Sequence, residues 1–211
     1  GSGSGNNASV TQCNVIDIAT GIRLNATNAS VFNNTIRSGT NAGIEFYGTN
    51  NLAWNNTLSS NNYNVVFNST SNNTLENSTL SSPASADVFA TGASNNTIVS
   101  TNFTKTNMSF GDSSSNVSVK WFLTVSAVDN NSQALNASVV NVSTATGALV
   151  QSLTTGVDGI AFFGAVTEFV KNQSGTLNYS PLTITASRIA SNSTTRQHTE
   201  SGTTVIQVTD P

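Results

Sequence analysis

The feature that most constrains the fold is an internal repeat of about 22 residues in the N-terminal half of the chain. Asn-Asn-Thr or a close variant precedes Ile or Leu in VFNNTI, LAWNNTL and LENSTL. At this spacing two apolar columns appear, one with Val31, Ala53 and Leu75 and one with Ile36, Leu58 and Leu80. Helical repeats are longer and richer in Ala, Leu and Glu. The short apolar stretches therefore predict a coil of short parallel strands.

The period also predicts which side chains point into the coil. Two further columns are Ile22, Ile44, Val66 and Val88, and Leu24, Phe46, Asn68 and Ala90. Successive coils lie about 4.8 Å apart, which is the spacing of paired strands. Arg23 and Glu45 flank inward positions, so we expect an exposed ion pair between neighbouring coils. Phe67 and Phe89 continue that outer column, either as packing against a loop or the next domain or as a candidate partner patch.

The repeated Asn-Asn has a structural explanation that needs no glycan. Asn tolerates the left-handed backbone conformation of tight corners, and stacked side-chain amides form hydrogen-bonded ladders. We therefore expect the Asn positions of the repeat to lie at the corners of the coil.

The first coil begins without a visible cap. VTQCNV at residues 10–15 matches VFNNTI at an offset of 21 residues. The end of a solenoid is an unpaired strand edge, and soluble solenoids need caps. We expect the cap either outside this chain or on another copy, which makes residues 1–15 a candidate self-assembly segment through Val10, Cys13 and Val15. Cys13 is the only cysteine, and a free buried thiol is favoured over an intermolecular bridge.

The second half of the chain has no such period. From residue 117, short alternating segments such as VKWFLTVSAVD, ASVVNVST and PLTITASR are separated by turn residues. Six or seven strands in this length predict an antiparallel β-sandwich.

Two families resemble these halves. The GI-x-L plus NNTI pattern of residues 8–112 resembles parallel β-helix repeat proteins of archaeal and some bacterial cell surfaces. Residues 119–209 are similar to the carboxypeptidase-regulatory-like, transthyretin-like sandwiches, through Asp129, Ala137, Val139, Thr155 and Gly159. This resemblance implies a stalk or spacer. Some relatives carry a Lys–Asn isopeptide bond, but the last strand here has no Asn to pair with Lys120, so we do not expect that bond.

The expected fold is therefore all-β. An N-terminal segment (1–15) precedes a right-handed parallel β-helix (16–116), and an Ig-like or transthyretin-like antiparallel sandwich (117–211) follows.

Eighteen Asn-x-Ser/Thr sequons occur, about twice the number that random placement of the same residues gives. The C-terminal half has no Asn ladder, yet six of its seven Asn lie in sequons. We therefore predict N-linked glycans, with Asn33, Asn55 and Asn77 poorer candidates because they would crowd in one column. Asn68 is included although its column is predicted to point inward. The predicted sites are Asn7, Asn25, Asn28, Asn68, Asn72, Asn95, Asn102, Asn107, Asn116, Asn130, Asn136, Asn141, Asn172, Asn178 and Asn192.

Composition argues against several function classes. Charged residues are 8% of the chain, the net charge is −3, and the seven Lys and Arg are scattered, so no basic stripe suits nucleic acid. No run approaches the roughly 18 apolar residues of a membrane span. Asp17, Glu45, Glu76, Asp87 and Asp112 do not cluster as a lyase or hydrolase site requires. His-Thr-Glu at 198–200 lacks the Cys pair of a zinc deaminase.

We expect no enzyme activity, cofactor or metal. The leading hypothesis is a structural subunit of an extracellular, archaeal-type, glycosylated filament or cell-surface lattice that assembles with itself. The alternative is a carbohydrate-binding adhesin or a stalk, with surface glycans as partners.

Overall fold

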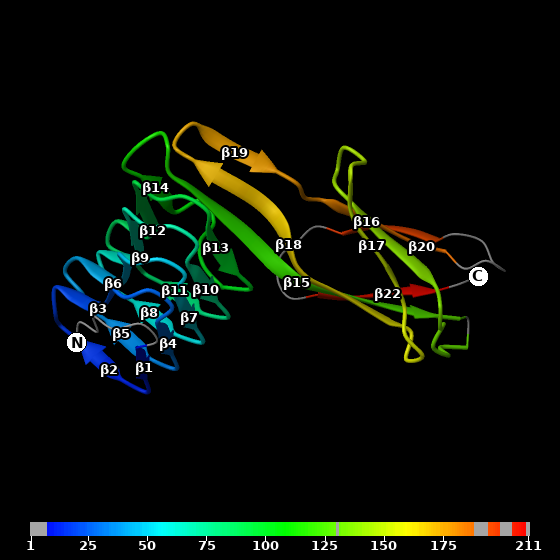
Figure 1. The fold of residues 1–211 in the computed structure, drawn as a ribbon, viewed down its shortest axis with the longest axis horizontal. Helices are drawn as coiled ribbons and strands as arrows, with labels where there is room; N and C mark the ends of the chain where they lie inside the picture. Colours follow the sequence, from blue (N-terminus) through cyan, green and yellow to red (C-terminus); the bar gives the residue numbers. More distant parts are fainter. Residues whose placement is uncertain (1–7, 130, 188–193, 199–203, 210–211) are drawn as a thin grey trace. The chain divides into compact units, whose positions relative to one another are not determined.

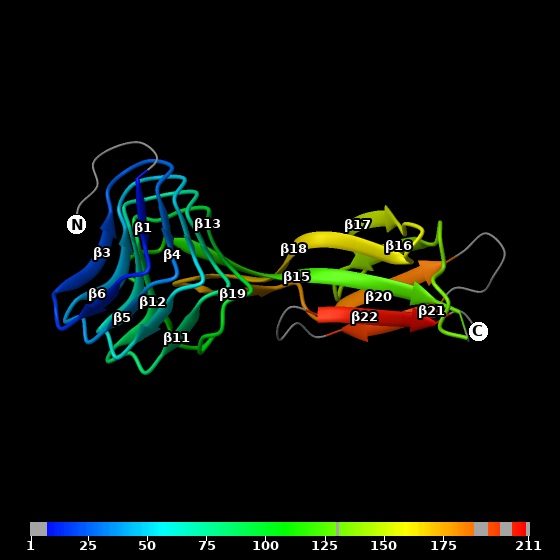
Figure 2. The same ribbon diagram turned by 90° about the horizontal axis from the view of Figure 1, so that it is seen from below.

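The computed structural model describes residues 8–129, 131–187, 194–198 and 204–209, the last two ranges by their backbone (Figures 1 and 2). These residues form strands, turns and loops, with no helix among them. The chain divides into two units. The first contains residues 8–119 and 170–176, and the second contains the described residues of 120–169 and 177–209. The segment 170–176 returns to the first unit, which the sequence did not predict.

The first unit is a β-solenoid of about five turns, with one strand per turn in each of three parallel sheets (Figure 1). Sheet I contains β1 (Ser9–Thr11), β4 (Ser30–Phe32), β7 (Leu52–Trp54), β10 (Thr74–Glu76) and β13 (Asn96–Val99). Sheet II contains β2 (Asn14–Ile16), β5 (Thr35–Arg37), β8 (Thr57–Ser59) and β11 (Thr79–Ser81). Sheet III contains β3 (Thr20–Leu24), β6 (Ala42–Phe46), β9 (Tyr63–Asn68), β12 (Ala86–Thr91) and β14 (Met108–Phe110).

The predicted columns of sheets I and II are confirmed. In sheet I, Val31 pairs with Ala53, Ala53 with Leu75, and Leu75 with Ile98. In sheet II, Ile36, Leu58 and Leu80 are likewise in register and buried. Because each column repeats the same apolar position, the interior of the solenoid is a stack of matched side chains.

Sheet III departs from the predicted register at the third coil. The connection from Ser59 to Tyr63 is one residue shorter than the equivalent connection from Arg37 to Ala42. Ile44 therefore pairs with Val65 and not with Val66. A slip of one residue moves every side chain of a strand to the opposite face.

This slip overturns the predicted exposed Phe67–Phe89 stack. Phe67 takes the inward position expected for Asn68, is fully buried, and stacks on Phe46 with ring centroids 5.0 Å apart. Phe89 is half-buried and stacks instead on Tyr63, at 4.9 Å. A partner patch made of both phenylalanines is therefore not present on the surface.

The two residues of the Asn-Asn pair have different roles, one in the turn of the backbone and one in hydrogen bonding between coils. The first residue, Asn33, Asn55 or Asn77, is exposed and has a left-handed backbone with φ between 46° and 57°. The second residue is buried, and the Oδ1 of Asn56 accepts hydrogen bonds from the backbone N–H and the side-chain amide of Asn34. The predicted corner position and ladder are thus both present.

A second ladder lies at the corner between sheets III and I. The backbone N–H of Ala29 donates to Asn51 Oδ1, that of Asn51 to Asn73 Oδ1, and that of Asn73 to Asn96 Oδ1, at 2.8–3.0 Å. The side-chain amide of Asn73 also donates to Thr70 Oγ1. A buried N–H without an acceptor is costly, so these side chains satisfy corner backbone groups that no strand can reach.

Asn73→Ala should lower the free energy of unfolding by about 2–4 kcal/mol, because the backbone N–H of Asn51 loses its buried acceptor. Asn41→Ala is the matched control, since Asn41 is exposed and donates only to the Thr20 hydroxyl among side chains. It should cost less than about 0.5 kcal/mol. Chemical denaturation of both variants measures the difference, and equal losses would contradict the role of the ladder.

The second unit packs two sheets around one core. One sheet contains β18 (Ile160–Asn172), β15 (Asn116–Val128) and β22 (Thr204–Thr209), with β19 (Gly175–Asn178) beside β18. The other contains β17 (Leu149–Thr154), β16 (Val139–Ser143), β20 (Leu182–Ser187) and β21 (Thr194–His198), all antiparallel. β22 pairs with β15 in parallel, so the pairing is not antiparallel throughout as predicted.

The core of this unit follows from strand alternation. Every second residue of β15 is buried, and those from Trp121 to Ala127 belong to this unit. Leu123 and Val125 of β15 pack with Val140 and Val142 of β16, and Leu182 of β20 completes the cluster from the same second sheet.

Candidate assembly surface and glycosylation sites

The first coil forms one end of the described part of the solenoid. β1, β2 and β3 are each the last strand of a sheet, and each pairs on one side only among the described strands. Val10 and Val15 are half-buried, whereas their counterparts one coil further in, Val31 and Ile36, are fully buried. Ile16 and Ile18 at this end are 36% and 42% exposed. The end of the coil thus combines unpaired backbone with apolar side chains.

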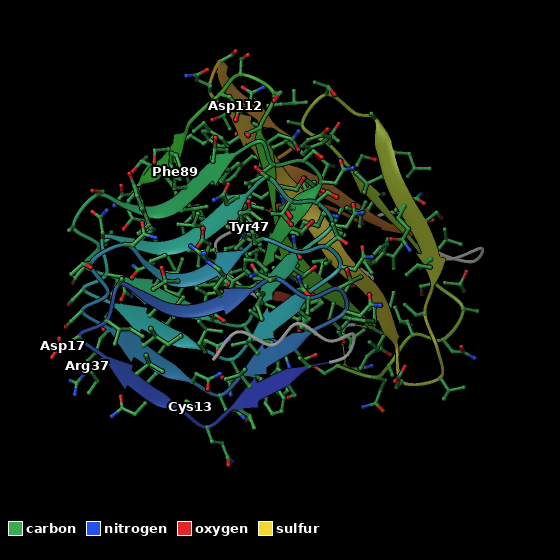
Figure 3. The ribbon with its side chains drawn as sticks, turned by 60° about the vertical axis from the view of Figure 1, so that its left-hand side comes forward. Cys13, Asp17, Arg37, Tyr47, Phe89 and Asp112 are labelled. Atoms are coloured by element: carbon green, nitrogen blue, oxygen red, sulfur yellow. The ribbon has the colours of Figure 1, made fainter. Side chains whose placement is uncertain are left out.

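Cys13 lies at this end with an exposed side chain (Figure 3), so the prediction of a buried thiol was wrong. Its backbone N–H donates to Asn34 Oδ1 at 2.9 Å, so the residue occupies the lowest position of the first Asn ladder. Its thiol lies 3.4 Å from the carbonyl oxygen of Thr11. Val10, Cys13 and Val15, the predicted self-assembly residues, therefore all lie in the edge coil, and their role in assembly stays a prediction.

The outer side of sheet III carries a charged pair that is more buried than predicted. Arg23 Nε donates to Glu45 Oε2 at 2.7 Å, with the Arg23 side chain 47% exposed and that of Glu45 only 3%. The Asn68 amide donates to the other carboxylate oxygen at 3.1 Å. Tyr47, 49% exposed, lies with its ring 6.0 Å from the Arg23 guanidinium (Figure 3). The expected exposed ion pair is thus half-buried, and Glu45 needs both partners because burying a lone carboxylate is costly.

This arrangement bears on the sequon at Asn68. N-linked glycans attach to the side-chain amide nitrogen, and in Asn68 that nitrogen donates to buried Glu45. Attachment would disturb an acceptor that has little access to water. The structure therefore argues against a glycan at Asn68.

We expect Asn68 to remain unmodified in protein purified from its source, while the exposed sequon Asn25 carries glycan. Mass spectrometry of peptides, after enzymatic deglycosylation in heavy-oxygen water, measures occupancy at both positions. Asn25 serves as the matched control because its sequon also lies beside a strand of sheet III. High occupancy at Asn68 would contradict the hydrogen bond as a barrier.

The other predicted sequons differ in exposure. Among the described residues the exposed ones are Asn25, Asn28, Asn72, Asn95, Asn102, Asn136 and Asn178. The half-buried ones are Asn107, Asn116, Asn141 and Asn172. Asn7, Asn130 and Asn192 lie outside the described residues. Whether any of these sites carries a glycan stays a prediction.

Crowding between neighbouring coils affects a second pair of sequons. Asn33 and Asn55 are exposed and not inward, and the Asn55 amide donates to Asn33 Oδ1 at 2.6 Å. Asn72 and Asn95 also stand in one column of neighbouring coils, since Thr74 pairs with Thr97. Crowding therefore disfavours simultaneous glycans on this second pair as well.

Asp112 organises the loop after β14. Its carboxylate accepts hydrogen bonds from the hydroxyl and N–H of Ser114, from the Gly92 N–H, and from the hydroxyl and N–H of Ser115. The bonds from the Ser114 hydroxyl, then Gly92 and Ser115, lower the pKa of Asp112 well below its ordinary value of 3.8. The carboxylate thus stabilises the turn in its charged form.

The contribution of Asp112 to stability should be complete above the ordinary carboxyl pKa and should disappear as the pH falls through the lower pKa of the folded protein. Asp112→Asn should therefore lower the unfolding temperature at neutral pH, and the gap to the unchanged protein should close in strong acid. Thermal unfolding across pH measures this gap. A gap that does not depend on pH would contradict the electrostatic role.

The remaining acids do not form a reactive cluster. Asp87 is fully buried and accepts hydrogen bonds from the Asn64 amide at 2.7 Å and the Thr104 N–H at 3.0 Å. Glu76 accepts one from the Asn77 amide. Within the described part of the chain, no three His, Cys, Asp or Glu side chains come together as metal ligands. The side chain of His198, from the His-Thr-Glu segment, lies outside the described side chains.

Sequence reasoning missed Tyr47, Tyr63 and Asn64. Tyr47 and Tyr63 are aromatic residues at strand ends, where the 22-residue period does not predict whether a side chain points inward or outward. Asn64 lies within the shifted strand β9, and only the shortened connection before it could have indicated its place.

Compared with known protein families and with curated proteins, the chain matches none. No helix among the described residues is long and apolar enough to cross a membrane.

Proposed function

We propose that this chain is a structural subunit of an extracellular, glycosylated filament or surface lattice, assembling with itself through its N-terminal segment and first coil. The single observation that carries the proposal is the first coil, which forms one end of the described part of the solenoid. Three sheets end there together, with unpaired strand edges around Val10, Val15, Ile16 and Ile18. An exposed edge of this kind is a template for another chain.

The surface chemistry supports an extracellular setting. With 8% charged residues and 18 sequons, the chain has little charge to keep it dispersed and many sites for sugar. The second unit fits the role of a spacer, in keeping with the transthyretin-like resemblance. Its long strands β15 and β18 carry the chain between the two units.

A carbohydrate-binding adhesin is the alternative, and one observation bears on it. The Phe67–Phe89 platform is absent because Phe67 is buried, which leaves Tyr47 beside Arg23 as an exposed aromatic ring next to hydrogen-bond donors. Loss of binding to immobilised glycans in Tyr47→Ala, with the fold unchanged, would favour this alternative.

Electron microscopy of the full chain, purified with its glycans at neutral pH, tests the structural proposal. Regular fibres or sheets are expected, and deletion of residues 1–15 should abolish them because it removes β1 and most of β2. Circular dichroism of the deleted protein establishes that the rest still folds. Separate particles of one subunit's size from the full chain would overturn the proposal.

A further inference from the structure

A second apolar surface lies on the second unit, in the longest part of the chain without a sequon. Residues 142–171 contain no Asn at all. They include half of the ten exposed large hydrophobic side chains, and these are Leu149, Val150, Val157, Ile160 and Phe162. A glycan on Asn141, which pairs with Ser152, would stand beside this stretch on the face of the sheet, whereas β17 itself carries no predicted site.

Leu149 and Val150 lie on the edge strand β17, whereas Ile160 and Phe162 lie on β18 of the other sheet. β17 pairs with β16 and with no other described strand, so its other edge is unpaired. Five of its six residues are exposed, including Leu149 at 62% and Val150 at 43%. The strand has no charged residue and no Pro, which are the usual protections of a free edge. β17 is thus suited to pairing with another strand.

The direction of the backbone groups identifies which residue faces the free edge. The Thr155 N–H donates to Ser138 O at 2.9 Å, toward β16. Backbone N–H groups alternate between the two edges of an antiparallel strand. Ser152, which pairs with Asn141, lies an odd number of residues before Thr155. The N–H of Ser152 therefore points away from β16, toward any added strand.

The first coil offers a second unpaired edge. The predicted sites Asn7 and Asn25 flank it and none lies within residues 8–24, and β3 is the longest of the three edge strands, with five residues against six in β17.

We propose that the free edge of β17 in one copy receives the first coil of the next copy, with β3 as the added strand. The proposal rests on the proposed self-assembly and names its second surface. The two surfaces lie on different units, so the contact is head-to-tail. A contact of this kind that does not close into a ring repeats indefinitely and produces a filament.

Ser152→Pro tests the β17 edge directly. Proline removes the N–H that faces the free edge and leaves the hydrogen bonds to β16 in place, as tolerated on edge strands. We expect this variant to stay monomeric in sedimentation velocity and to form no fibres, while its unfolding temperature stays close to that of the unchanged chain. Ser152→Ala, which keeps the N–H, is the control and should form fibres normally.

Ile18→Lys tests the other surface by placing a charge at the end formed by the first coil. Thr40→Lys is its control, because Thr40 is exposed at the same corner one coil further in and its N–H donates to Ile18 O. Ile18→Lys should be monomeric and Thr40→Lys should form fibres. An equimolar mixture of Ser152→Pro and Ile18→Lys has one intact pair of surfaces, so it should form dimers and nothing longer.

The outcomes separate this inference from the proposed function. Fibres from Ser152→Pro as abundant as those from Ser152→Ala would overturn the β17 contact and leave self-assembly standing. A mixture that stays monomeric would also overturn the pairing of these two surfaces. If the unchanged chain forms no fibres, the proposed function itself fails.

Discussion

The solenoid depends on hydrogen bonds between a side chain of one coil and the backbone of the coil before it. Strands pair their own backbone groups, but the corners cannot, because the chain turns there and its N–H groups face the interior. Asn51, Asn73 and Asn96 supply the missing acceptors, one per coil. Each ladder therefore fixes the relative position of successive coils, and the apolar columns of all three sheets follow from that register.

Sequence alone predicted the parts of the fold that obey the period. The columns of Val31 and Ile36 and the corner Asn positions repeat at constant spacing, so stacking the sequence was sufficient. In sheet III the prediction was wrong for the third coil alone, because one missing residue before Tyr63 reverses the inward and outward positions of β9, while Val88 and Ala90 of the fourth coil keep their predicted columns. The burial of Glu45 was missed for a related reason, since its cover comes from Asn68 and Arg23 on neighbouring coils.

The signals for the predicted sites differ in how local they are. A sequon is three consecutive residues, but its use depends on what the Asn amide contacts in space, and the contact from Asn68 to Glu45 spans 23 residues. The edge of β17 could not be found from sequence, because the alternation of LVQSLT does not say whether one or both of its sides are paired. Only the strand order shows that one side is free.

The shortened connection before Tyr63 has a consequence for how such a coil tolerates change. The connection after β9 is longer, since Phe67 to Thr74 spans seven residues where Phe46 to Leu52 spans six. Thr57 still pairs with Thr79, and Leu52 with Thr74, as if nothing had been lost. The residue missing from one corner is thus compensated by an extra residue at the next corner, and the registers of sheets I and II are unchanged. Related sequences can therefore change which residues of one sheet face the interior, while the inward-facing residues of the other two sheets stay the same.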